Sequence, residues 1–326
     1  MPPDGAHVVM LAPFWGKNPE DQADPSSGRF DRYVEVGPAL FEPVPLESAD
    51  LAVFPCEWSR SLAPAAESFV AEALEVGRPT VIFVGADDHE TVSYEGAVVF
   101  QTSLYRSQRR SNEFAQPAWS EDFITMYFGG ELPVRSKGLK PVVGFCGLAP
   151  RRRGILTRLR AHPAHTSVRA GALRLLRDHS GVETNFVERD RFLGGAVARG
   201  QLDPEVMRRV RDEYVRNIVE SDYVLCTRGA GNFSYRLYET LNCGRIPVFV
   251  DTDCVLPYDF VASWRDHCVW VDEGSLASIG DRVAAFHESL GKGEFVELQR
   301  ECRRFWEDYL SPEGFFGHFH EHLARV

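Results

Sequence analysis

The stretch from residue 221 to 259, SDYVLCTRGAGNFSYRLYETLNCGRIPVFVDTDCVLPYD, most constrains the fold of this chain. Its first apolar run is short and ends in a glycine-containing turn, which indicates a buried parallel strand that enters a loop. A short helix should follow, capped by Asn232 or Ser234 and stopped at Gly244, and residues 246–250 should form the next buried strand. In an open parallel sheet, ligands bind where strands end and helices begin. The stretch therefore predicts a ligand site at its glycine loop.

The side chains of this loop and helix suit a phosphorylated ligand. Gly229 and Gly231 let the backbone approach a ligand closely, and Ser234 and Arg236 lie in the first helical turn, where free N–H groups bind phosphate. A guanidinium can bind two phosphate oxygens. Glu239 is three residues after Arg236, so the two share one helix face, and its carboxylate can accept hydrogen bonds from both hydroxyls of a ribose.

These residues resemble the signature of the exostosin-type glycosyltransferases. The matching positions are Gly229, Ser234, Arg236, Glu239, residues 244–248 (GRIPV), Asp251 and residues 256–257 (LP). Upstream, the strand 142–146 followed by Gly147 and the arginines 151–153 resembles the family's other marker. The resemblance fades before residue 141, so it does not cover the half of the chain that would bind an acceptor.

The resemblance implies an α/β protein of the GT-B fold, in which two Rossmann-like domains face each other across a cleft and a C-terminal helix returns to the first domain. It also implies an inverting glycosyltransferase that uses a nucleoside diphosphate sugar, for which we expect a UDP-sugar, and a glycan or small-molecule acceptor. Arg236 would be catalytic because it stabilises the departing diphosphate. The residues expected to bind the sugar donor are Gly147, Arg151, Arg228, Gly229, Gly231, Asn232, Ser234, Arg236 and Glu239.

The length of 326 residues favours two domains. We expect an acceptor-side domain at 1–138, a nucleotide-sugar-binding domain at 139–300 and a C-terminal helix at 301–326, with residues 131–141 as the connection. Strands are expected at 7–11, 51–54, 80–84, 98–101, 141–146, 184–187, 223–226, 246–250 and 268–271, and helices at 64–76, 167–177, 204–219, 276–290 and 294–310.

Charge and cysteine content limit the classes of partner and compartment. A net charge of −11 argues against nucleic acid as a partner, since that binding needs a basic face. The seven cysteines form no C-x-x-C pair, which indicates reduced core thiols. There is neither a signal-peptide pattern nor an apolar run long enough to span a bilayer, so we expect a cytoplasmic protein of bacterial type.

The first half of the chain offers candidates for a general base. The expected strand 80–84 runs into GADDHE, and we predict Asp88 as the base because Asp87 is better placed to cap the turn. Asp87, His89 and Glu90 are alternatives in the same turn. A solvated polar turn is the competing interpretation. Glu113 and Asp122 are more distant alternatives. The arginines 106, 109 and 110 indicate a solvated surface or, alternatively, a wall for an anionic acceptor.

Other interpretations of the central stretch remain open. Asp251 and Asp253 resemble a D-x-D metal site, but Arg236 and the helix terminus already supply positive charge, so we expect no metal and no other cofactor. A sugar-nucleotide epimerase or hydrolase could use the same layout. A non-catalytic carbohydrate-binding protein could also retain the fold, although the presence of Ser234, Arg236 and Glu239 argues against it.

Overall fold

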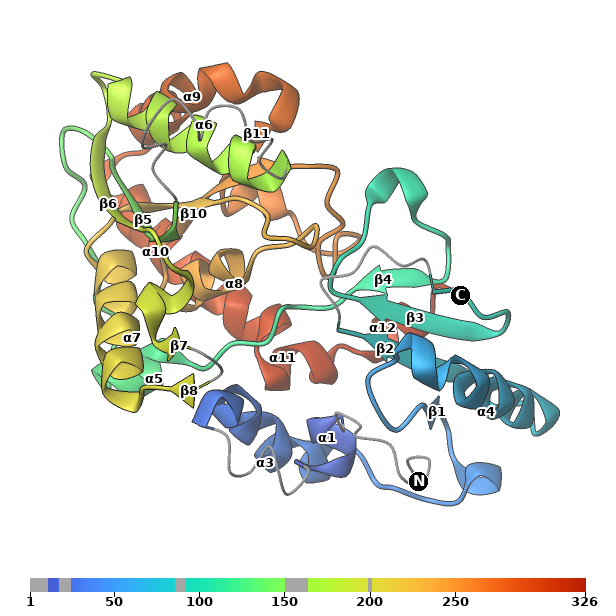
Figure 1. Ribbon diagram of the computed structural model, residues 1–326. Helices are drawn as coiled ribbons and strands as arrows, with labels where there is room; N and C mark the ends of the chain where they lie inside the picture. Colours follow the sequence, from blue (N-terminus) through green and yellow to red (C-terminus); the bar gives the residue numbers. More distant parts are fainter. Residues whose placement is uncertain (1–10, 18–24, 86–91, 150–163, 199–200) are drawn as a thin grey trace, which may run out of the picture.

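The computed structural model describes residues 11–17, 25–85, 92–149, 164–198 and 201–326. It contains two parallel β-sheets, each flanked by helices (Figure 1). The first sheet has the order β1-β2-β3-β4, formed by β1 (Ala52–Val53), β2 (Thr80–Val84), β3 (Ala97–Gln101) and β4 (Glu113–Ala115). The second has the order β11-β10-β9-β5-β6, formed by β5 (Val142–Leu148), β6 (Glu183–Arg189), β9 (Tyr223–Cys226), β10 (Ile246–Asp251) and β11 (Val269–Asp272). A small antiparallel pair joins β7 (Val197–Ala198) and β8 (Gln201–Leu202).

Helices connect and cover these sheets. The α-helices are α1 (Ala12–Trp15), α3 (Asp31–Leu40), α4 (Ala63–Glu75), α5 (Phe123–Phe128), α6 (Ala164–Asp178), α7 (Pro204–Val219), α8 (Tyr235–Asn242), α9 (Ile279–Ser289), α10 (Lys292–Phe305), α11 (Pro312–Gly317) and α12 (His320–Leu323). The 3-10 helices are η1 (Pro25–Phe30), η2 (Leu46–Ser48), η3 (Arg60–Leu62), η4 (Arg106–Gln108), η6 (Phe192–Gly195), η7 (Trp264–Asp266) and η8 (Glu273–Ser278), and η9 (Trp306–Leu310) is π-helical. No helix among the described ranges has both the length and the apolar composition of a bilayer span.

The central strands are apolar because both of their faces are covered. Every residue of β2, with the sequence TVIFV, and of β10, with the sequence IPVFVD, is buried, as expected for a parallel sheet between two helical layers. The strand runs were therefore readable from the sequence. The predicted class, an α/β protein of the GT-B type with two Rossmann-like sheets, is confirmed.

Local capping rules also hold at two helices. The Asp203 side chain accepts from the N–H groups of Glu205 and Val206 and so begins α7, with Pro204 in the first turn. The helix α8 ends before Gly244, which has φ +58°. A Cβ there would lie 2.8 Å from the Gln299 carbonyl oxygen, so the position requires glycine for both conformation and space.

Several segments differ from the sequence-based expectation: β4 and α5 were not predicted, and most of the expected strand 7–11 lies outside the described residues. Residues 12–17, expected to be a loop, contain the helical turn α1, and α3 was not predicted at all. The arginines near residue 106 are largely exposed, as the solvated-surface interpretation expects, but two of them also form ion pairs that were not predicted: Arg106 pairs with Asp251 at 2.9 Å and Arg109 with Asp259 at 2.6 Å. Asp251 is the last residue of β10 and Asp259 follows that strand, so Arg106 and Arg109 join the two halves of the molecule.

The chain enters the second domain earlier than the expected connection at 131–141. Phe123, at the start of α5, is fully buried in the core of the second domain, and its N–H donates to Asn242 Oδ1 at 3.1 Å. Residues 131–141 then lie along this domain, because Arg135 Nε donates to Asp222 Oδ1 at 2.7 Å. The boundary predicted at 138 therefore falls within a segment that is docked on the second domain.

Arg245 fixes this docked segment from inside the second domain. Its guanidinium is fully buried and donates to the carbonyl oxygens of Pro133, Val219 and Cys243, and to Gln299 Oε1. Burial lowers the pKa of the Arg245 guanidinium to about 10. Arg245 thus holds the segment against the C-terminal end of α7 and against α10.

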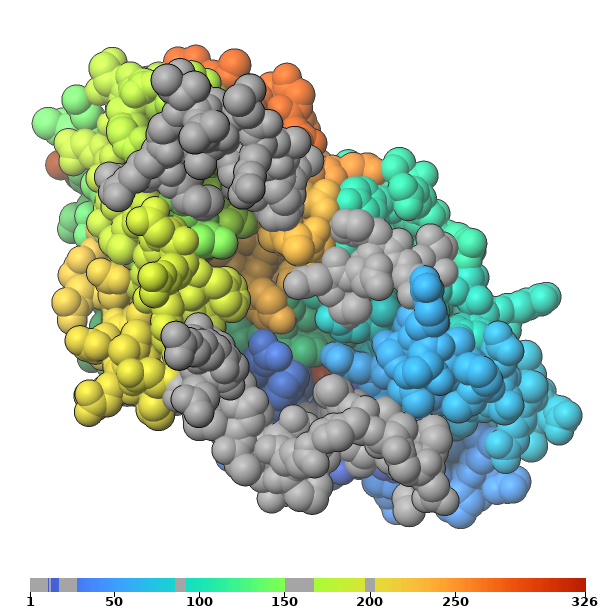
Figure 2. All heavy atoms as spheres, in the orientation of Figure 1, coloured from blue at the N-terminus to red at the C-terminus, as the bar shows by residue number. Residues whose placement is uncertain are grey.

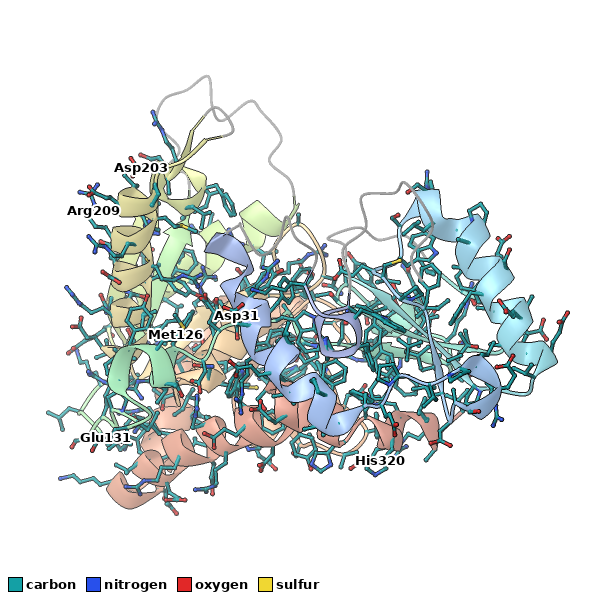
Figure 3. All side chains as sticks on the ribbon, turned by 90° about the horizontal axis from the view of Figure 1, so that it is seen from below. Asp31, Met126, Glu131, Asp203, Arg209 and His320 are labelled. Atoms are coloured by element: carbon teal, nitrogen blue, oxygen red, sulfur yellow. The ribbon has the colours of Figure 1, made fainter. Side chains whose placement is uncertain are left out.

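The C-terminal segment returns to the first domain, as the predicted fold class required. Phe316 and Phe319 pack with Phe83 of β2 and Phe100 of β3 in one aromatic core, where the Phe100 and Phe319 rings stack at 5.0 Å. Figure 3 shows the C-terminal helices running beneath the second domain toward His320 on the side of the first sheet. The core of the first domain therefore includes the end of the chain.

His322 is buried without a polar partner in this aromatic core. Its ring lies 4.4 Å from the Tyr258 ring and 4.9 Å from the Phe100 ring, and neither ring nitrogen has a hydrogen-bond partner among the described residues. Burial lowers the pKa of the His322 imidazole to about 3 against an opposing effect of the Phe319 backbone, and the charges of Arg109 and Arg325 act in the same direction as burial. The folded protein therefore keeps this ring neutral.

This neutral ring predicts a loss of stability in mild acid. The unfolded chain takes up a proton at His322 below the ordinary pKa of 6.5, whereas the folded chain does so only near 3. The contribution of neutral His322 to the free energy of unfolding is therefore complete above pH 6.5. Below that pH it declines by about 1.4 kcal/mol per pH unit. When the pH is lowered from 7.5 to 5, we expect the free energy of unfolding of wild type, measured with urea, to fall by about 2 kcal/mol more than that of His322→Phe. The exposed His320, changed to Gln, is the control; parallel curves for wild type and His322→Phe would contradict the prediction.

Candidate functional site

The second sheet opens between β5 and β9, because the strand order reverses there. These strands pair at Val143 with Tyr223 and at Gly144 with Val224, whereas β5 continues beside β6 as far as Leu148. Such a reversal leaves a crevice at the carboxyl ends of the strands, where ligands of open α/β sheets bind. Figure 2 shows the surface hollowed between the two domains, with gold-coloured residues of the second domain at its floor. The predicted glycine loop follows β9 and borders this crevice.

Arg236 occupies the edge of β5 that β9 leaves. The Val142 carbonyl accepts from the Asp222 N–H on the β9 side, and since carbonyls alternate along a strand, that of Cys146 points the same way. Arg236 Nη2 donates to this Cys146 oxygen at 3.0 Å, and the guanidinium lies 4.5 Å from the centre of the Phe145 ring. Arg236 Nε is buried and has no hydrogen-bond partner in the described part of the chain. The side chain is thus fixed, while its Nε–H lacks an acceptor among the described residues.

The absence of a side chain at Gly147 leaves room for the Arg236 guanidinium. A Cβ at this position would lie 2.7 Å from Arg236 Nη2, which is closer than real contacts of this kind allow. The glycine predicted from the family marker is therefore explained by its packing under the guanidinium. Its contact with a sugar donor stays a prediction.

Glu239 lies one turn after Arg236 and is held by Tyr214 of α7. The Tyr214 hydroxyl donates to Glu239 Oε2, and the Tyr214 ring centre is 5.9 Å from the Arg236 guanidinium carbon. Burial raises the pKa of the Glu239 carboxyl above its ordinary value, against the opposing effects of the tyrosine hydrogen bond and the charges of Arg211 and Arg236. Arg236 and Glu239 lie on one face of α8, as the sequence spacing predicts, and this face borders the crevice. Tyr214 was not predicted, because nothing in the sequence of α7 distinguishes it from a core aromatic residue.

The turn before α8 leaves space for a ligand. Ser234 is buried at the N-cap position, but its side chain makes no capping hydrogen bond. A Cβ on Gly229 would have its nearest neighbour, the Phe233 oxygen, at 3.9 Å, and neither Gly229 nor Gly231 has a positive φ. The protein fold therefore does not require glycine at 229. The predicted close approach of a ligand to the backbone at Gly229 and Gly231 remains untested.

A second guanidinium lies beside this turn and was missed in the sequence. Arg169, from α6, donates through Nη1 to the Leu148 carbonyl at 3.0 Å. Its sequence signal is an arginine at the start of an apolar helix stripe, which continues through the buried residues Ala172, Leu173 and Leu176.

Two of the predicted donor-binding residues lie at the junction of the domains. Arg228 Nη1 donates to the Tyr105 hydroxyl of the first domain at 2.7 Å. Asn232 is fully buried: its N–H donates to Ser103 Oγ at 2.8 Å, and its Oδ1 accepts from Thr252 at 2.6 Å. These contacts give both residues a structural role at the junction, and their predicted contact with a sugar donor is not tested by them.

The two aspartates of the alternative metal site belong to the same junction. Asp251 Oδ2 accepts from Arg106, and its Oδ1 accepts from the Cys254 N–H at 3.0 Å. Asp253 Oδ2 accepts from the Ser107 N–H at 3.1 Å and from the Ser107 hydroxyl. Both carboxylates therefore have protein partners, and in the described ranges no group of three metal-ligating side chains occurs.

The predicted base Asp88 and the predicted donor ligand Arg151 lie outside the described residues. Glu57 lies beside the described end of the same turn, since a Cβ on Gly85 would meet its carboxylate. This half-buried carboxylate follows β1, at the ligand-facing edge of the first sheet, and was not considered in the sequence. Of the more distant alternatives, Asp122 caps α5 and binds Arg303 through both oxygens, at 2.8 and 2.9 Å.

Comparison with known proteins locates the similarity in one segment. The chain is 29% identical to Drosophila melanogaster Exostosin-1 over 100 residues, which is 31% of this chain and 13% of that protein. It is 28% identical to human Exostosin-2 over 98 residues, or 30% of this chain and 13% of that protein, and 28% identical to a Caenorhabditis elegans Exostosin-1 homolog over 100 residues, or 31% and 25%. The matched segment thus spans a quarter or less of these relatives. The predicted resemblance to exostosins is confirmed.

Solved structures give a more distant similarity. A point mutant of S. aureus TarM, in complex with fondaparinux, alpha-GlcNAc-glycerol and UDP, has a TM-score of 0.40 and 11% identity over 77% of this chain and 53% of that chain. A glycosyltransferase from Rickettsia africae ESF-5 has a TM-score of 0.39 and 12% identity over 83% and 69%. No protein-family model matches the chain.

The contact between Gly147 and Arg236 predicts the effect of one added methyl group. In Gly147→Ala, the new Cβ displaces the guanidinium from the Cys146 carbonyl. Because the clashing atom is the end of a flexible side chain, we expect the fold to persist while affinity for a nucleoside diphosphate falls about tenfold or more. Isothermal titration measures this. Gly274→Ala is the control, since nothing lies within 4 Å of that position; equal affinity of Gly147→Ala and wild type would refute the prediction.

Proposed function

We propose that this chain is an inverting glycosyltransferase that moves a sugar from a UDP-sugar to a hydroxyl group of a glycan or small-molecule acceptor. The proposal depends on the environment of Arg236. This side chain is fixed at the crevice by its hydrogen bond to the β5 carbonyl edge, and its buried Nε–H has no acceptor among the described residues. An anion in the crevice would complete its hydrogen bonds. The exostosin similarity supports the same reaction class.

Each side chain of the site has a role in this reaction. Arg236 binds the diphosphate more strongly as negative charge develops on it, and the first N–H groups of α8 with the Ser234 hydroxyl add hydrogen bonds. Glu239 accepts from the ribose hydroxyls through the oxygen that Tyr214 leaves free. The acceptor hydroxyl attacks the anomeric carbon in line with the departing diphosphate, and a carboxylate of the first domain removes its proton.

The reaction is proposed to need no divalent metal. In other enzymes, a D-x-D motif holds a metal ion against the diphosphate. Here Asp251 and Asp253 accept hydrogen bonds from Arg106 and Ser107, which supports a junction role for both carboxylates. The positive charge that offsets the leaving group then comes from arginine side chains and from the terminus of α8.

The compartment and partners follow from composition and burial. All seven cysteines are buried free thiols, which supports action in a reducing compartment such as the cytoplasm. The net charge of −11 makes nucleic acid an unsuitable partner. The partners of this proposal are therefore the nucleotide sugar and a hydroxyl-bearing acceptor.

The function is tested by release of UDP from UDP-sugars in the presence of EDTA, with and without candidate acceptors. We expect activity that depends on the acceptor and survives EDTA. Arg236→Ala should lose about 2 to 4 kcal/mol of transition-state stabilisation, and Arg236→Lys should also be poor because a lysine lacks the planar two-point contact. The exposed Arg209 on α7, changed to Ala, is the control. Release without an acceptor would indicate a hydrolase, restoration of EDTA-treated enzyme by manganese would indicate a metal site, and wild-type rates in Arg236→Ala would exclude its role.

The proposed base is Asp88, and Glu57 is its structural competitor. Asp88→Asn should bind UDP as wild type does yet lose about a hundredfold to ten-thousandfold in transfer rate, the usual contribution of a positioned base. Glu57→Gln is the matched comparison, because its carboxylate lies beside Gly85, where the described part of that turn ends. A rate loss in Glu57→Gln with an unchanged Asp88→Asn would move the assignment to Glu57.

A further inference from the structure

Arg169 is an arginine in a position that a core residue would normally occupy. It lies three, four and seven residues before Ala172, Leu173 and Leu176, all buried against the second sheet, so it continues their face of α6 toward the carboxyl ends of the strands. A guanidinium at such a position needs a hydrogen-bond partner for each of its N–H groups. Those partners show what Arg169 holds together.

Each nitrogen of the Arg169 guanidinium has an acceptor, and the acceptors come from two strands. Nη1 donates to the Leu148 carbonyl at the end of β5, at 3.0 Å. Nε donates to Thr227 Oγ1 at 3.2 Å, and Nη2 to the Arg228 carbonyl at 3.0 Å, both directly after β9. The two strands no longer pair at this level. Arg169 therefore bridges the gap at the mouth of the crevice and fixes the first residues of the glycine loop.

Arg169 and Arg236 also form a pair of like charges. They donate to the carbonyls of Leu148 and Cys146, two residues apart on the same edge of β5. In the part of the chain that is described, neither guanidinium has a carboxylate partner. Burial lowers the pKa of the Arg169 guanidinium to about 10, and the charge of Arg236 acts in the same direction. A bound anion would offset this repulsion.

We propose that Arg169 is a positioning residue of the diphosphate site: it ties the glycine loop to the end of β5 and, with Arg236, forms a two-guanidinium edge that favours a diphosphate over a monophosphate. The inference rests on the proposed function. Two fixed cations interact more favourably with the larger charge of a diphosphate, and a phosphate at each guanidinium satisfies both. Loss of Arg169 should therefore change the preference between UDP and UMP, which general damage to the site would not change.

The test compares the affinities of UDP, UMP and inorganic pyrophosphate for the 326-residue chain by isothermal titration. We expect Arg169→Gln to weaken UDP and pyrophosphate binding roughly tenfold to a hundredfold, and UMP binding by no more than about threefold, since one phosphate can still bind Arg236. Arg174→Gln is the matched control, because Arg174 lies on the same helix but is exposed. It should leave all three affinities unchanged.

Two outcomes would overturn the inference. One is wild-type affinity for UDP in Arg169→Gln, and the other is an equal loss for UDP and UMP in a folded variant, which would leave Arg169 a purely structural role. If Arg169→Gln does not fold, Arg169→Lys decides: it keeps the charge but lacks the planar two-point contact with a phosphate and cannot reach all three acceptors, so the ratio of UDP to UMP affinity should still fall. An unchanged UDP-to-UMP ratio overturns the inference. If folded wild type binds neither pyrophosphate nor UDP, GDP or dTDP, that result contradicts the proposed function itself.

Discussion

The unpaired carbonyl edge of β5 is the feature on which the site depends. Beyond Gly144, β9 turns away, and the carbonyls of Cys146 and Leu148 would face an empty gap. A buried carbonyl without a partner is costly, and two arginines from different helices supply the missing donors. The same bonds that complete the sheet therefore concentrate positive charge at its opening. The hydrogen bonds from these two arginines to β5 therefore both stabilise the sheet and create a positively charged site that can bind an anion.

The junction between the domains adjoins this charged edge. Backbone bonds from the Val255 N–H to the Leu104 carbonyl and from the Arg106 N–H to the Asp253 carbonyl join loops at the carboxyl ends of the two sheets. Asn232 belongs both to this junction and to the glycine loop. A shift of the first domain would therefore be transmitted directly to the residues that precede α8. The two domains are therefore linked through Asn232 as well as through the backbone bonds and ion pairs of the junction.

The sequence was most informative where local rules decide the structure. The strand Tyr223–Cys226 and the helix Pro204–Val219 were predicted with the bounds observed, because an apolar run and a capped periodic pattern are local signals. The helix α3 was missed because Gly37 and Pro38 obscure its pattern, and it is held instead by the packing of Tyr33 among aromatic residues far along the chain.

The roles of individual side chains were less predictable than the motif that contains them. Arg236 and Glu239 lie together because three residues separate them on one helix, which the spacing alone implies. Arg169 reaches the same place from a helix about sixty residues earlier, and only the pairing of β5 and β9 brings it there. Asn232 shows the opposite error: its place in a glycine loop suggests a ligand contact, while its hydrogen bonds all lead into the domain junction.

The docking of the segment before β5 on the second domain also determines where the chain can be cut to make chimeras that exchange domains. Arg245 and Gln299 bind the backbone of Pro133 and Arg135, and Phe123 already belongs to the core of the second domain. A breakpoint chosen from composition, at the proline-rich and glycine-rich linker, would separate the buried Arg245 from the Pro133 carbonyl and Gln299 from the Arg135 backbone. A chimera that exchanges the first domain would therefore keep the second domain intact only if the cut lies upstream of α5 and if the new first domain also supplies aromatic residues that fit α11 and α12.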